Sequence, residues 1–344
     1  MAVWLDVSSS HGGWSLTDTD RMRRLVQGMN HPSTQYPSVV FFIGKKRKVQ
    51  ALKSLFPYNN ITRRGAGGIA KLHLSASTVR TSHSVFVIDG DLDGALAAQR
   101  LPKPNPAPRT QSLRLHIDEG PSFSHVRDMI YGRLLFPFTH VVCIFADDLG
   151  GLARVRDNLV QWSSLMPPPR HPCSERPRVV VVVTDTAGKA RQASIPDPQS
   201  LLRSVEGFAS EPMVLDLRGR RELSPSARFH PLQTLLLHEL DLARIARVER
   251  RFLFSAVHLD ALFRKAATHI AKHPHTRFNF IPAARLGNPV NENLAEHLQS
   301  FVAVSKTAEV PASAITDYVA SALLMDGYPP GMHGMSPTVI SRTM

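Results

Sequence analysis

The chain has 344 residues, of which 43% are hydrophobic and 26 are proline, as in a globular protein with some irregular connections. This length suffices for two domains. Lys and Arg number 41 against 28 Asp and Glu, which gives a formal net charge of +13. That charge favours contact with anionic groups but identifies no chemistry, because it bears on association rather than on a reaction.

The cysteines and the apolar runs indicate a compartment. Two cysteines are too few for the disulfide framework of a small secreted protein, and neither has the spacing of a zinc ligand. The N-terminus lacks a basic segment followed by a long apolar one. The longest aliphatic run, residues 179–183, is far shorter than the roughly 20 residues that cross a bilayer. We therefore expect a cytoplasmic protein without a transmembrane segment.

The first 221 residues predict a lead-in followed by an α/β domain. Residues 1–35 are polar and predict a flexible lead-in. From residue 38 onward, short apolar runs end in Gly or Asp and precede helix-length segments, as buried parallel strands do. The predicted strands are residues 39–43, 85–88, 141–145, 179–183 and 213–217, with 70–76 as an edge strand. The predicted helices between them are residues 47–55, 124–135 and 152–165. The alternation predicts a mostly parallel sheet flanked by helices over residues 36–221.

The remaining segments predict loops, a helical domain and a tail. The proline-rich segments 102–108 and 166–177 predict surface loops, because proline removes a backbone donor and fixes φ. Beyond residue 221, apolar residues recur at spacings of three and four, which predicts an all-helical domain over residues 222–333. Residues 334–344 lack such periodicity and predict an irregular tail.

Glycine and acidic residues follow the first two predicted strands. Gly44 ends the first run and opens a basic helix, and Asp89 ends the second run before the D-x-x-G sequence of residues 91–94. Ligands of open α/β sheets bind beyond the carboxyl ends of such strands. The pattern is similar to that of a P-loop GTPase, in which the first turn holds phosphates and the second supplies a magnesium-associated Asp.

The phosphate-binding turn departs from the working motif. A P-loop reads G-x-x-x-x-G-K-[ST], whereas Gly44 is followed directly by four basic residues, and TDTA at residues 184–187 stands where N-K-x-D would bind a base. The sequence therefore predicts a degenerate P-loop NTPase-like fold, with an unrelated α/β domain as a second interpretation. The alternative function is a switch that binds GTP or ATP with Mg²⁺. Its nucleotide-binding residues would be Gly44, Lys45, Lys48, Asp89, Asp91 and Gly94.

Other motifs have simpler structural explanations. GAGGIA at residues 65–70 matches the loose dinucleotide fingerprint but follows a helix and a turn instead of a strand. His269, His273 and His275 lack the Glu of a zincin helix, so we expect no metal site. No G-x-S-x-G elbow occurs, so the sequence predicts no catalytic residue and favours a protein that is not an enzyme.

The basic segment 44–64 indicates which kinds of partner the chain could bind. It contains seven Lys and Arg residues and no acidic residue, but almost no aromatic side chain that would stack on bases. Nucleic-acid binding is therefore not favoured. The segment is better explained as a solvated helix face or a partner-binding surface, and residues 45–48 are the place where an anionic ligand would bind.

Several segments resemble one family in order along the chain. LLFPFTHVVCIFADDLGG at residues 134–151 resembles the region upstream of the catalytic domain in large fungal patatin-like phospholipase proteins. Further similar segments are FIG at 42–44, ALKSLFP at 51–57, LSPSARF at 223–229, LFSA at 253–256 and ALLMDGYPPGMH at 322–333. In that family the patatin domain, with its Ser-Asp dyad, lies further toward the C-terminus. The resemblance implies a non-catalytic accessory module, linked to lipid metabolism by association, whose partner is a protein or a covalently linked hydrolase domain.

Overall fold

The computed structural model describes residues 3–10, 13–61, 68–92, 110–117, 120–166, 176–185, 202, 205–249, 252–276, 278–280, 283 and 293–326. The chain divides into two compact units, Met1–Phe278 and Asn279–Met344. No helix in the described part of the chain has the length and apolar character needed to span a membrane.

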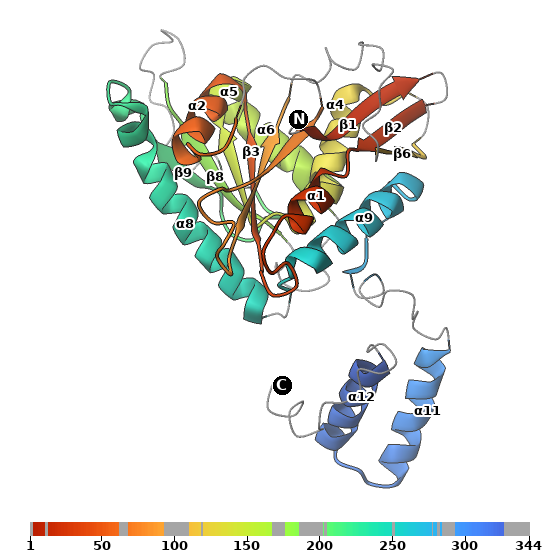
Figure 1. The fold of residues 1–344 in the computed structure, drawn as a ribbon. Helices are drawn as coiled ribbons and strands as arrows, with labels where there is room; N and C mark the ends of the chain where they lie inside the picture. Colours follow the sequence, from red (N-terminus) through yellow and green to blue (C-terminus); the bar gives the residue numbers. More distant parts are fainter. Residues whose placement is uncertain are drawn as a thin grey trace. The chain divides into compact units, whose positions relative to one another are not determined.

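The first unit is built on a nine-stranded sheet with the order β6-β2-β1-β4-β5-β3-β7-β8-β9 (Figure 1). Its strands are β1 (Val3–Ser10), β2 (Gly13–Asp18), β3 (Ser38–Ile43), β4 (Ala70–Leu74), β5 (Val85–Gly90), β6 (Gln111–Arg114), β7 (Val141–Phe145), β8 (Arg178–Val183) and β9 (Met213–Asp216). Strands β5, β3, β7, β8 and β9 pair in parallel, whereas β6, β2, β1, β4 and β5 pair antiparallel. The α/β class is confirmed, but the sheet is mixed instead of mostly parallel.

The antiparallel half contains most of the segment that we expected to be a flexible lead-in. Trp4, Leu5 and Val7 of β1 are buried, and β1 pairs with both β2 and β4. Strand β4 is therefore internal, lying between β1 and β5, and is not the expected edge strand. Asp6 and the serines at residues 8–10 stand beside these buried residues, so the segment lacks a continuous apolar run. The lead-in is thus part of the sheet.

Helices pack on both the parallel and the antiparallel half of the sheet. They are α1 (Arg21–Gln27), α2 (Lys46–Leu55), α4 (Phe123–Met129), α5 (Ala146–Leu149), α6 (Leu152–Leu165), α8 (Pro225–Glu249) and α9 (Ala256–Lys272), with the π-helix η1 (Ile130–Leu135) and the 3-10 turns η2 (Phe136–Phe138) and η3 (Arg218–Arg220). Helices α2 and α8 pack together over one face (Figure 1). On the opposite face, Phe41 of β3 lies edge-on to Tyr131 of η1, with ring centroids 4.9 Å apart.

The domain boundary differs from the expected one at residue 221. Phe229, Leu232, Leu236 and Leu240 of α8 belong to the same core as the parallel strands. Helix α9 packs on β1 through Phe263, whose ring centroid lies 4.4 Å from that of Trp4. Both helices therefore complete the first unit, because their apolar faces are needed to cover its sheet.

The second unit contains α11 (Leu294–Thr307) and α12 (Ala312–Asp326). The rings of Phe301 and Tyr318 stack between these helices, with their centroids 5.2 Å apart. The expected loop at 102–108, residues 167–175 of the second expected loop, and the expected tail at 334–344 lie outside the described residues.

Candidate functional site

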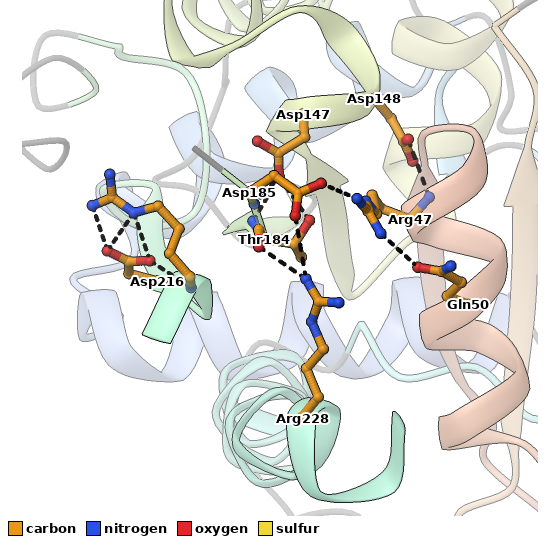
Figure 2. Close-up of polar contacts among 9 residues, drawn as sticks. Arg47, Gln50, Asp147, Asp148, Thr184, Asp185, Asp216 and Arg228 are labelled. Atoms are coloured by element: carbon orange, nitrogen blue, oxygen red, sulfur yellow. Dashed lines mark hydrogen bonds and ion pairs between the residues drawn. The ribbon is translucent and has the colours of Figure 1, made fainter. Parts of the chain in front are cut away.

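The parallel strands bring several charged residues to one edge of the sheet. Parallel pairing aligns the carboxyl ends of β5, β3, β7 and β8, so the residues that end these strands become neighbours. We call this set the strand-end cluster, and Figure 2 shows most of its side chains. Its members are Gly44, Arg47, Lys48, Asp89, Asp147, Asp148, Thr184, Asp185 and Arg228.

Lys48 and Asp89 form a buried ion pair. The ammonium nitrogen of Lys48 lies 2.6 Å from a carboxylate oxygen of Asp89, and each side chain is only 4% exposed. The same ammonium group also donates to the carbonyl of Gly90. Two of the residues named in the nucleotide-binding alternative are thus in contact. Each depends on the other, because a buried charge left without its partner costs about 3–5 kcal/mol.

The carboxylate of Asp148 occupies the N-terminus of α2. One oxygen accepts hydrogen bonds from the amides of Lys45, at 2.6 Å, and Lys48, at 2.9 Å. The other oxygen accepts from the amide of Arg47 at 3.1 Å. The first amides of a helix have no partner within the helix and attract an anion. At this helix the anion is a side chain of the same protein, and it replaces the missing N-cap of Lys45.

Gly44 allows this close approach. A Cβ atom at residue 44 would lie 2.8 Å from a carboxylate oxygen of Asp148 and 3.1 Å from the Cβ atoms of Lys48 and Phe145. Residue 44 also has a φ of +155°. A larger residue would therefore have to displace Asp148 or move the start of α2.

Asp147 closes the neighbouring turn after β8. One of its carboxylate oxygens accepts hydrogen bonds from the Thr184 amide at 2.6 Å, the Thr184 hydroxyl at 2.7 Å and the Asp185 amide at 3.1 Å. Asp147 and Asp148 both lie in the four-residue helix α5, directly after β7. Two adjacent residues of one turn therefore bind the ends of two other strands, as Figure 2 shows.

Two arginines hold Asp185 between α2 and α8. Arg47 forms an ion pair with its carboxylate, and the guanidinium group of Arg228 lies 3.6 Å from it. Arg228 also donates to the Thr184 carbonyl at 2.8 Å. At the end of β9, hydrogen bonds from Arg218 lower the pKa of Asp216. Side chains of the protein itself thus link the end of β8 to α2 and to α8, whereas the Asp216–Arg218 pair is local to the turn after β9 (Figure 2).

The remaining predicted residues contribute less. Lys45 enters the cluster through its amide, and the carbonyl of Asp91 accepts a hydrogen bond from the Tyr131 hydroxyl at 3.1 Å. Gly94 and residues 65–67 of the GAGGIA segment lie outside the described residues. His269 and His273 lie near the end of α9 with ring centroids 5.4 Å apart. Over the described ranges, no three His, Cys, Asp or Glu side chains are grouped so that they would hold a metal ion.

Asp147, Asp148, Asp185 and Arg228 were not among the predicted site residues. A signal for the first two was present, because a pair of Asp residues follows the apolar run 141–145 in the same way that Asp89 follows its own run. No protein-family model matches the sequence, and the search of curated proteins finds no match either.

Proposed function

We propose that the chain is a non-catalytic interaction or regulatory module on a degenerate P-loop-like fold, in which its own carboxylate takes the place of a phosphate. The main observation behind this proposal is that Asp148 accepts hydrogen bonds from three amides at the start of α2. The parallel strands β5, β3, β7 and β8 and the helix that follows β3 support the P-loop-like interpretation. In that interpretation these amides would otherwise cradle a phosphate.

The charges around the N-terminus of α2 disfavour the binding of a phosphate group. A phosphate group would have to displace Asp148 from the amides. It would then compete with Asp89 for Lys48, whose positive charge Asp89 already neutralises. A P-loop lysine instead directs its charge toward the β- and γ-phosphates. Both elements that recognise phosphate are therefore engaged by carboxylates of the chain, and we expect no nucleotide binding by the unmodified protein.

The alternative is a nucleotide switch that binds GTP or ATP with Mg²⁺. The contact between Lys48 and Asp89 favours it, since a lysine at a helix start and a carboxylate at the next strand end are two parts of such a site. In this alternative, Asp148 leaves the α2 amides when the nucleotide binds. The two functions differ in whether the carboxylate is a permanent occupant or a displaceable one.

Calorimetry on the wild type and the Asp148→Ala variant separates them. We expect the wild type to bind neither GTP, ATP nor inorganic phosphate at millimolar concentration, with or without Mg²⁺. We expect Asp148→Ala to gain phosphate binding, because three amides lose their acceptor. Asp157→Ala is the matched control, since Asp157 is an exposed carboxylate of α6 that pairs with its neighbour Arg156.

Two results would contradict the proposal. Micromolar, Mg²⁺-dependent nucleotide binding by the wild type, lost in Asp89→Asn, would establish the switch instead. A folded Asp148→Ala variant that gains no affinity for phosphate would show that Asp148 is not what keeps anions out.

The proposed partner is another protein or, in relatives, the linked hydrolase domain. This part of the proposal rests on the resemblance to the region upstream of patatin-like domains. The segment that carries the resemblance most strongly, residues 134–151, supplies Asp147 and Asp148 to the strand-end cluster. In this view the segment has a structural role, and the module acts through its surface.

A further inference from the structure

Helix α8 has apolar residues on two opposite faces. Its inner face packs against the sheet through residues such as Phe229 and Leu236. On its outer face, Leu237 is 57% exposed, Ile245 is 54% exposed and Val248 is 56% exposed. A helix that covers one side of a sheet normally has a polar outer face. Grouped apolar exposure of this kind marks a surface that another molecule covers.

The outer face follows a heptad-like spacing. Leu237, Asp241, Arg244 and Val248 are separated by four, three and four residues, and we call these four residues the outer stripe. Two charged residues lie in the middle of the outer stripe, and an apolar residue lies at each end. Asp241 and Arg244 form an ion pair with each other in the isolated chain.

We propose that the outer stripe binds the outer stripe of a second copy of this chain. With the two α8 helices antiparallel about a two-fold axis near residues 242 and 243, Leu237 lies opposite Val248 of the partner subunit, and Asp241 lies opposite Arg244 of the partner subunit. The symmetry repeats each contact, as in any isologous interface. Two apolar contacts then flank two ion pairs of opposite charge.

Charge complementarity selects this occupant and this orientation. A parallel pair of α8 helices in register would place Asp241 against Asp241 and Arg244 against Arg244, and such like-charge pairs are repulsive. In the antiparallel arrangement each ion pair within a chain is exchanged for one between the two chains, so every charge keeps an opposite one beside it. Leu237, Asp241 and Val248 of the outer stripe are exposed, and none of its four residues belongs to the strand-end cluster. The inference therefore does not depend on whether the strand-end cluster binds a ligand.

Sedimentation of the full chain over a wide range of concentrations tests the proposal. We expect a monomer–dimer equilibrium in the wild type. Asp241→Arg or Arg244→Asp alone places like charges opposite each other twice, and we expect dimerisation to weaken by roughly tenfold or more. The double variant Asp241→Arg with Arg244→Asp restores both pairings and should restore the dimer. Asp157→Arg, in an exposed pair with Arg156 on α6, is the matched control and should dimerise like the wild type.

Leu237 and Asp241 are exposed, whereas the side chain of Arg244 is only 22% exposed. Asp241→Arg and the uncharged Leu237→Ser therefore test the interface most directly. Far-UV circular dichroism should be unchanged in each variant, and so should the melting temperature when it is measured at a concentration at which the wild type is monomeric. A wild type that is monomeric at every concentration would overturn the proposal. So would a dimer that the single charge reversals leave intact, or a double reversal that fails to restore it.

Discussion

Asp147 and Asp148 are neighbours in the sequence, yet each one closes the turn that ends a different strand. The difference follows from helix α5, which is a single turn and directs consecutive side chains to β8 and to α2. Gly44 makes the second contact possible by leaving room for the carboxylate. Gly44, Asp147 and Asp148 thus determine whether the backbone amides at this edge of the sheet are available to a ligand or bonded within the chain.

Another carboxylate has an effect on stability that depends on pH. Asp18 at the end of β2 is buried, and burial raises its pKa from 3.8 to about 6, although a hydrogen bond from the Asp20 amide opposes this shift. The folded state therefore binds this proton more tightly than the unfolded state. As the pH rises from about 4 through 6, the Asp18 carboxyl ionises in the folded protein and stability is lost.

We expect Asp18→Asn to raise the free energy of unfolding at neutral pH by about 2–3 kcal/mol relative to the wild type, and to have little effect below pH 4. Urea unfolding of both proteins across this pH range measures the difference. Asp157→Asn changes an exposed carboxylate and should leave the profile unchanged. A wild type and an Asp18→Asn variant with parallel profiles would show that Asp18 ionises as freely in the folded state as in the unfolded one.

At the scale of elements, the sequence predicts the buried strands closely. The strand expected at 141–145 coincides with β7 (Val141–Phe145), and the one expected at 179–183 lies within β8 (Arg178–Val183). Both are covered on two sides, so nearly every residue is apolar and the pattern is unambiguous. β1 is different, because Asp6 and three consecutive serines stand beside its buried Trp4, Leu5 and Val7, so its composition resembles that of a loop. Its partners are set by long-range pairing, which no local pattern reveals.

For the strand-end cluster and for the domain boundary at α8, the sequence likewise predicts local features but not long-range contacts. Lys48 and Asp89 could be placed near each other because strand-end residues of parallel strands meet. The contact of Asp148 with α2 depends on the register between β3 and β7, and neither segment alone specifies it. The periodicity of α8 predicts a helix, but it does not tell whether the apolar face covers another helix or the sheet.

A substitution in strand β8 tests whether this strand lies in the interior of the sheet. Val181 is fully buried and lies between Ile144 of β7 and Val214 of β9. Val181→Asp would place an unpaired carboxylate there, and we expect the free energy of unfolding to fall by several kcal/mol, about 3 or more. Val160→Asp, at an exposed position of α6, is the control and should change stability little. Unchanged thermal stability in Val181→Asp would be incompatible with a central β8.

At the scale of the whole molecule, the first unit contains its own core. The sheet, α2 and α8 form one hydrophobic cluster, and α9 packs on the antiparallel half through Phe263. We expect a chain that ends at residue 278 to unfold cooperatively with the same midpoint in urea as the first unit of the full protein. The truncated chain retains α8, so it should also retain the dimer. A truncated chain without a cooperative transition would show that residues 279–344 are needed for the fold.

The occupied α2 N-terminus has a consequence for how the module responds to the cell. A nucleotide switch changes shape with the supply and hydrolysis of its ligand, because its loops have no other partner for their amides. In this chain that partner is covalently attached at residue 148 and is always present. Under the proposed function, the conformation of this edge is set once, at folding, and does not respond to the supply of nucleotide. A signal would then reach the module only through what binds its surface.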